Sequence, residues 1–156
     1  MSTLLVYFTE DPQIRRLCEQ SRADGTQTLE LLEHFDRSAL YISTVGSYMA
    51  LAGKSSVVIN ADVNLDAYDS VIIASPVWAG NPAPAINAFL RANDLKGKTV
   101  TGILFGAGMA GALANDVLRK RIALAGGTCR DVMNIQKKEI TRCAGTGLVR
   151  LALAGA

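Results

Sequence analysis

"YDSVIIASPVWAGNPAPAINAFL", residues 68–90, is the most specific segment of the sequence. Its apolar run Val71–Ala74 is typical of a strand that is buried on both faces of a parallel sheet. The prolines that follow fix φ and predict a preorganised loop over Ser75–Pro84. Apolar residues at helical spacing then predict a helix over Pro84–Asn93. The loop between strand and helix carries Trp78, the only tryptophan in the chain.

Outside this stretch, apolar runs also alternate with segments of helical period. The other predicted strands are Thr3–Phe8, Thr26–Leu32, Val100–Phe105 and Cys129–Ile135, of which the second and the last are edge strands. The other predicted helices are Pro12–Asp24, Ala39–Lys54, Ala112–Ala125 and Glu139–Ala154, the last weakened by Gly145 and Gly147. Five strands and five helices predict one α/β domain, residues 1–156, with an open, doubly wound five-stranded parallel sheet, since a closed barrel needs eight such units.

Composition narrows the possible functions. The chain has 156 residues, is 49% hydrophobic and carries a net charge of +2 with both signs scattered. The absence of a basic block argues against nucleic-acid binding, and the short apolar runs argue against membrane insertion and a secretory signal. Cys18, Cys129 and Cys143 are odd in number and lack CxxC spacing, which favours reduced thiols in a cytoplasmic protein.

The doubly wound sheet predicts where a ligand binds. Ligands of such sheets lie outside the carboxyl ends of the strands, where the strand order reverses. The loops expected there are Thr9–Gln13, Ser75–Pro84 and Gly106–Gly111. An indole in the middle loop could cover the face of a planar ring system. Composition alone favours the alternative, in which Trp78 packs on its own domain or on a partner.

The opening stretch together with "LKGKTVTGILFGAG", residues 95–108, closely resembles the flavodoxin family. The likeness is to short bacterial members of the flavodoxin / NAD(P)H-quinone oxidoreductase type. It is strong over Asp66–Gly108, weaker over Tyr41–Ile59, and holds in element order along the chain. The resemblance implies the strand order 2-1-3-4-5 and FMN lying across the three loops. The implied cofactor-binding residues are Thr9, Gln13, Ser75, Pro76, Val77, Trp78, Ala79, Gly80, Gly106, Ala107 and Gly108.

The first loop departs from the family. Family members carry a hydroxyl- and glycine-rich loop that holds the FMN phosphate, whereas this chain reads Thr9-Glu10-Asp11-Pro12-Gln13-Ile14. Asp11 before Pro12 predicts a helix N-cap whose carboxylate occupies the anion position from within the chain. Lost N–H donors and like charge would each weaken phosphate binding by roughly 1–3 kcal/mol. Arg15 and Arg16 could compensate in part, but the sequence does not give their direction.

The leading hypothesis is therefore an FMN-binding redox protein that passes electrons to a partner protein or a quinone. One alternative is a flavodoxin-fold binding module that has lost FMN; another is binding of riboflavin or a different planar ligand without a phosphate. No side chain resembles an acid/base or a nucleophile, so no catalytic residue is predicted. His34, the only histidine, lacks partners at ligand spacing, so no metal site is predicted. The sequence does not distinguish a flavin-dependent enzyme from a non-enzymatic electron carrier. It also does not predict the oligomeric state.

A second glycine motif, "GAGMAG" at residues 106–111, matches the dinucleotide pattern G-x-G-x-x-G. Asp131 follows about 20 residues later, as the fingerprint requires of its acidic residue. However, only 45 residues follow Gly111, too few for a second mononucleotide-binding half, and Asp131 falls inside a predicted strand. A glycine-rich loop near the flavin edge, or simply a tight turn, explains the glycines more economically.

Overall fold

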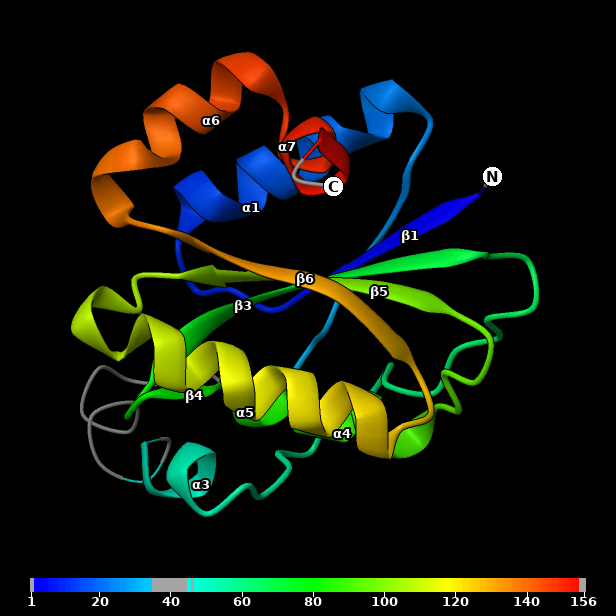
Figure 1. The fold of residues 1–156 in the computed structure, drawn as a ribbon, viewed down its shortest axis with the longest axis vertical. Coiled ribbons are helices and arrows are strands. Elements are labelled where there is room, and N and C mark those ends of the chain that lie inside the picture. The colour runs from blue at the N-terminus through cyan, green and yellow to red at the C-terminus, as the bar shows by residue number, and fades with distance from the viewer. Residues whose placement is uncertain (1, 35–44, 46, 155–156) are drawn as a thin grey trace.

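A parallel sheet with helices on both faces forms the centre of the computed structural model, which describes residues 2–34, 45 and 47–154 (Figure 1). The sheet order is β2-β1-β3-β5-β6. These strands are β1 Thr3–Tyr7, β2 Gln27–Glu30, β3 Ser70–Trp78, β5 Thr99–Phe105 and β6 Thr128–Ile135, and neighbouring strands pair in parallel. The predicted doubly wound α/β fold and the order 2-1-3-4-5 of its parallel strands are confirmed.

The helices form two layers (Figure 1). One layer contains α1 Pro12–Gln20, α6 Ile140–Thr146 and α7 Leu148–Ala154, and the other contains α3 Ser47–Leu51, α4 Pro84–Ala92 and α5 Gly111–Leu124. Short 3-10 turns lie at Ser21–Asp24, Gly108–Ala110 and Lys137–Glu139. The first part of the predicted helix Ala39–Lys54 lies outside the described residues, and in its described part α3 ends at Leu51 rather than Lys54. None of the helices in the described ranges is long and apolar enough to cross a membrane.

The apolar run of β3 is buried because helices cover both faces of the sheet. Successive side chains of a strand point to opposite faces. Val71 and Ile73 therefore join the core beneath α4 and α5, whereas Ile72 and Ala74 join the core beneath α1, α6 and α7. All four side chains are at most 1% exposed. Burial on both faces explains why the strand is continuously apolar rather than alternating.

The predicted loop Ser75–Pro84 is wrong in its first half. β3 continues to Trp78 and folds back as the short antiparallel strand β4, Asn81–Pro82. Val77 pairs with Pro82, and Trp78 pairs with Asn81. Proline lacks an N–H donor and is tolerated only at the edge of a sheet, where β4 lies. Pro82 thus marks the edge strand of a hairpin, whereas Pro76 still pairs with Phe105 at the end of the parallel sheet.

The predicted last helix, Glu139–Ala154, is also wrong as one element. The chain leaves the helical conformation at Gly147, whose φ is 84° and ψ 128°, and the helix divides into α6 and α7. Glu139 belongs to the preceding 3-10 turn. Glycine adopts positive φ without a steric penalty, so the residue expected to weaken the helix ends it instead.

Gly102 of β5 allows α5 to pack closely on the sheet. A Cβ at this position would lie 2.6 Å from Leu118 Cδ2 and 3.1 Å from the Val132 methyl carbons. Leu118 is fully buried and has no room to move aside. We expect Gly102→Ala to lower the free energy of unfolding by about 1–3 kcal/mol, because overpacking displaces the helix. Urea unfolding monitored by circular dichroism measures the change.

The same substitution at Gly145 provides the matched control. A Cβ there would meet no heavy atom within 4 Å, and the residue lies inside α6. Alanine forms helix better than glycine, so Gly145→Ala should raise the free energy of unfolding by about 0.5–1 kcal/mol. Two changes of the same sign would contradict the packing explanation.

The β3–β4 turn contains a non-glycine residue in the left-handed region. Ala79 has φ 49° and Gly80 has φ 73°, which is the pattern of a type I′ hairpin turn, where Asn-Gly is favoured. Ala79→Asn should raise the free energy of unfolding by about 0.5–1 kcal/mol, since asparagine tolerates this conformation better. Thermal unfolding should show the melting temperature rise by about 2–4 °C. Ala79→Val should lower it, and a valine variant as stable as the parent would refute the strain.

Candidate functional site

A pocket of about 200 Å³ lies at the carboxyl edge of the sheet. The ends of β3 and β5, the loop after β1 and the segment after β6 all contribute side chains to it. Of the residues predicted from sequence, Thr9, Pro76, Trp78 and Gly106 line this pocket. Glu10, Asp11, Ile14, Phe105, Lys137 and Ile140 complete the lining. The structure thus brings three separate predicted loops to one place.

Trp78 is held in position by its own domain. Its ring meets Phe8 edge to face, with 5.7 Å between ring centroids and an interplanar angle of 85°. Phe8 is 5% exposed, and Trp78 is half-buried against the core beneath α4 and α5. The indole therefore packs on its own domain and also lines the pocket. The two roles that the sequence left as alternatives are combined in one side chain.

The predicted N-cap at Asp11 is confirmed. Asp11 Oδ1 accepts a hydrogen bond of 2.8 Å from the Gln13 N–H, and Pro12 occupies the first turn of α1. Thr9 Oγ1 accepts a hydrogen bond of 3.0 Å from the Asp11 N–H. Pro12 itself has no N–H to donate. Two backbone donors that could face a bound phosphate already have side-chain acceptors from within the loop.

Arg15 is oriented by the neighbouring strand β2. Its Nε donates to Glu30 Oε1 at 2.7 Å, and its Nη2 donates to the Thr9 carbonyl at 3.1 Å. Tyr7, buried beneath α1, donates from its hydroxyl to Glu30 Oε2 at 3.4 Å. Burial, with Glu30 adding to it, raises the pKa of Tyr7. The Arg15 side chain thus holds the first loop through the Thr9 carbonyl and is paired with Glu30. The sequence could not predict where this side chain points.

Sequence reasoning missed the lining residues Phe105, Ile140 and Lys137, of which only Lys137 is charged. It is the one cation among the residues that line the pocket, beside the carboxylates of Glu10 and Asp11. It lies in the 3-10 turn that follows β6. The carboxyl end of β6 meets the same edge of the sheet as the other strands, so the residues just after Ile135 could have been included on that ground.

The other predicted site residues lie around the pocket but do not line it. Ser75 is fully buried, and its Oγ accepts a hydrogen bond of 3.0 Å from the Ala83 N–H. Val77 pairs across the hairpin, and Ala79 and Gly80 form its turn. Gln13 is exposed in the first turn of α1.

The glycine segment after β5 forms a tight turn. Gly106 has φ 69°, and its N–H donates to the Ile135 carbonyl at 3.0 Å. No heavy atom lies within 4 Å of a Cβ built at Gly106, so its backbone faces open space. Ala107 and Gly108, also predicted site residues, continue the turn and do not line the pocket.

The acidic residue of the possible dinucleotide motif is used elsewhere. Asp131 lies inside β6, as predicted, where its Oδ1 accepts from Arg119 Nη2 at 3.0 Å and from the Val132 N–H at 2.8 Å. It therefore does not project from a strand end toward a ribose, and the turn explanation of the glycine motif stands.

Cysteine and metal chemistry find little support in the described part of the chain. Cys18 is buried in the core under α1, and burial, with Glu30 and Glu19 adding to it, raises the pKa of its thiol to about 12. The thiol is therefore uncharged near neutral pH and is not a nucleophile. Within the described ranges, no group of three His, Cys, Asp or Glu side chains is placed to hold a metal ion.

No protein-family model matches the sequence, and no curated protein matches it significantly. Solved structures do resemble it. A flavoprotein from Lactobacillus acidophilus NCFM, solved in complex with FMN, superposes with a TM-score of 0.73 at 18% identity, over 90% of this chain and 97% of that one. Oxidised flavodoxin 2 from Bacillus cereus superposes with a TM-score of 0.54 at 18% identity, over 99% of both chains.

A third similar structure is the flavodoxin, WrbA-like protein from Agrobacterium tumefaciens, with a TM-score of 0.57 at 15% identity over 99% of this chain and 99% of that one. At these low identities the superpositions show the fold of the backbone alone. Together with the strand order and the two helical layers, they show that this chain has the flavodoxin fold.

Proposed function

We propose that this chain is a flavin-binding redox protein that passes electrons to a partner protein or a quinone. The observation that carries the proposal is the pocket where Trp78 and the Gly106 turn meet at the carboxyl edge of the sheet. In doubly wound sheets this edge is where ligands bind. The flavoprotein from Lactobacillus acidophilus, which shares the fold, was solved as an FMN complex.

The pocket suits the ring system of a flavin. Trp78 offers an aromatic surface, and Pro76, Phe105 and Ile140 add apolar walls that exclude water. The open backbone at Gly106 lets a ring approach closely. A bound flavin would supply the redox chemistry, while these residues orient its ring and set its surroundings.

The same pocket does not suit a phosphate. The N–H groups of Asp11 and Gln13 have acceptors within the loop, and the carboxylates of Glu10 and Asp11 line the site. Lys137 is the only lining cation that could offset this charge. The Asp11 cap therefore favours a second candidate function, in which the pocket binds riboflavin or another planar ligand that lacks a phosphate.

Two exposed apolar side chains follow the Gly106 turn along the chain and could contact an electron acceptor. The side chain of Met109, in the turn after Gly106, is fully exposed, and Leu113 at the start of α5 is 61% exposed. Apolar side chains next to a site are suited to brief contact with a quinone or a partner surface. The net charge of +2 provides no strong field for steering, so this contact would depend on shape more than on charge.

Titration of the protein into FMN and into riboflavin tests the proposal. We expect saturable quenching of flavin fluorescence, and a weakening of about tenfold in Trp78→Leu, because the aromatic contact is lost. Trp78→Phe keeps an aromatic face and should bind more tightly than Trp78→Leu. FMN binding more tightly than riboflavin supports the leading function, and riboflavin binding at least as tightly supports the second. Quenching of neither flavin would refute flavin binding, and with it the leading function.

A charge-only substitution tests the explanation for the phosphate site. Asp11→Asn keeps an effective N-cap and removes one negative charge, so the fold should persist. FMN affinity should rise by about tenfold or more, while riboflavin affinity stays the same, because only FMN carries the phosphate. Asp66→Asn makes the same charge change in an exposed residue before β3, at the opposite edge of the sheet, and should leave both affinities unchanged.

The double variant Asp11→Thr, Pro12→Gly goes further, since it restores a hydroxyl and a backbone N–H. It should bind FMN more tightly than Asp11→Asn does. If neither variant gains affinity for FMN, then the carboxylate of Asp11 is not what opposes the phosphate.

A further inference from the structure

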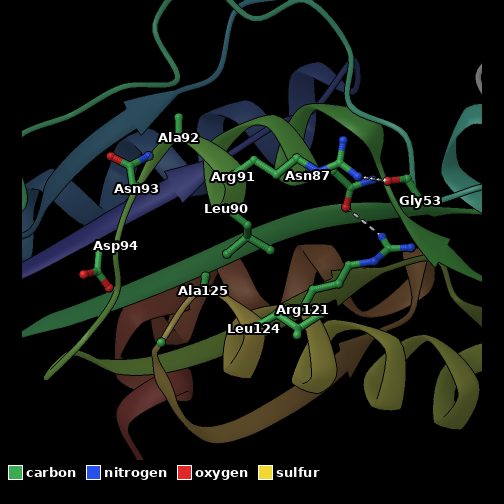
Figure 2. Close-up of a pocket in the computed structure, with 11 residues that line it drawn as sticks. Gly53, Asn87, Leu90, Arg91, Ala92, Asn93, Asp94, Arg121, Leu124 and Ala125 are labelled. Carbon is green, nitrogen blue, oxygen red and sulfur yellow. Dashed lines mark hydrogen bonds between the residues drawn. The ribbon is translucent and has the colours of Figure 1, made fainter.

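A second pocket, of about 710 Å³, lies between α4 and α5 (Figure 2). It is larger than the pocket at Trp78 and shares no lining residue with it. Its walls include Leu90 and Arg91 of α4, Arg121 and Leu124 of α5, and Gly53 after α3. The volume falls in the range of pockets that take small organic ligands, roughly 300–1,000 Å³.

One end of this pocket is positively charged. Arg121 Nη1 donates to Asn87 Oδ1 at 2.8 Å, and its Nη2 lies 3.4 Å from both the Ala50 carbonyl and Asn81 Oδ1. Burial lowers the pKa of Arg121, and the neighbouring charge of Arg91 lowers it further. The guanidinium is thus partly desolvated and repelled by a second cation.

Arg91 contributes that second cation. Its Nη2 donates to the Gly53 carbonyl at 2.9 Å, and Figure 2 shows both guanidinium groups directed toward the Asn87 end of the pocket. In the described part of the chain, every hydrogen-bond acceptor of these two groups is a neutral carbonyl or amide oxygen. The one lining carboxylate, Asp94, lies at the opposite end and accepts from the Lys96 N–H.

Arg121 is partly buried beside the exposed cation of Arg91, and among the described residues neither guanidinium has a carboxylate as a hydrogen-bond partner. A bound oxyanion would offset both charges. Guanidinium groups favour phosphate and carboxylate because their N–H donors match the geometry of these oxyanions. Next to the cations lies an apolar surface, made by buried Leu90 and by Leu124, whose side chain is 88% exposed at the rim. The pocket therefore offers positive charge at one end and apolar contact next to it.

We propose that this pocket binds a small organic anion, with its phosphate or carboxylate between Arg91 and Arg121 and its apolar body over Leu90 toward Leu124. The hydrogen bonds of Arg121 to α3, α4 and β4 hold the charged end in place before the ligand arrives. This site is separate from the flavin pocket, and its occupancy does not depend on the proposed redox function.

Calorimetric titration of the full chain with phenyl phosphate, benzoate and benzyl alcohol tests the proposal. Phenyl phosphate, benzoate or both should bind saturably at one site, and their comparison identifies the preferred oxyanion. Benzyl alcohol should bind at least about tenfold more weakly than the better anion, since it lacks the charge. Absence of saturable binding by either anion, or equal binding of the alcohol, would overturn the proposal.

Two variants test where the anion binds. Arg91→Gln removes an exposed cation that makes one hydrogen bond, and should weaken anion binding by about tenfold. Arg119→Gln removes the same charge from α5 outside the pocket, at a half-exposed ion pair with Asp131, and should leave affinity within about twofold. Equal effects of the two variants would mean that the anion senses only overall charge, which would overturn the site.

Amide nitrogen–proton NMR spectra of the same titration locate the ligand. Shifts should concentrate at Gly53, Arg91 and Ala125. Shifts concentrated at Thr9 and Gly106 would place the anion in the flavin pocket and overturn the proposal. Because this assay needs no flavin, failure of the redox function and failure of the anion site give different results.

Discussion

Burial of the central strands on both faces is the constraint on which the rest of the structure depends. A strand with apolar side chains on both faces needs a helical layer on each side, and parallel neighbours require crossover connections that supply those layers. Val71 and Ile73 face one layer, and Ile72 and Ala74 face the other. Once helices cover both faces, a ligand can reach the sheet itself only at the ends of its strands. The position of the pocket thus follows from the packing of β3 and its neighbours.

The first pocket combines an aromatic surface with an unusual first loop. Phe8 supports the indole from behind, so the orientation of Trp78 depends on side chains of this domain. At the adjoining helix terminus, Asp11 uses the backbone donor that a ligand phosphate would otherwise use. A phosphorylated planar cofactor needs apolar contact for its ring and N–H donors for its phosphate. This pocket would favour the ring and disfavour the phosphate.

Much of the fold was predictable because its signals are local. Apolar runs placed the parallel strands, and Asp11 before Pro12 placed the start of α1. The β3–β4 hairpin was not predictable in this way, because Pro76 and Pro82 read as loop residues until the pairing of Val77 with Pro82 is known. Features that depend on long-range pairing leave little trace in a short window of sequence.

The two pockets also differ in how far the sequence predicts their residues, because some of these residues meet only through long-range contacts. Thr9, Pro76, Trp78 and Gly106 follow or end strands, so topology alone places them near the carboxyl edge. The contribution of Lys137 depends on how the turn after β6 folds back toward the first loop. The pairing of Arg91 with Arg121 joins residues 30 positions apart on two helices, and no motif in the sequence marks it.

The Asp11 cap on α1 affects how the folding of this helix would depend on a ligand. A helix that relies on a ligand to satisfy its first N–H groups gains folding free energy from that ligand, so its population follows ligand supply through linkage. Here Asp11 meets part of that need within the chain itself. This terminus therefore depends less on a ligand for its folded form, and binding of a cofactor there would follow folding instead of driving it.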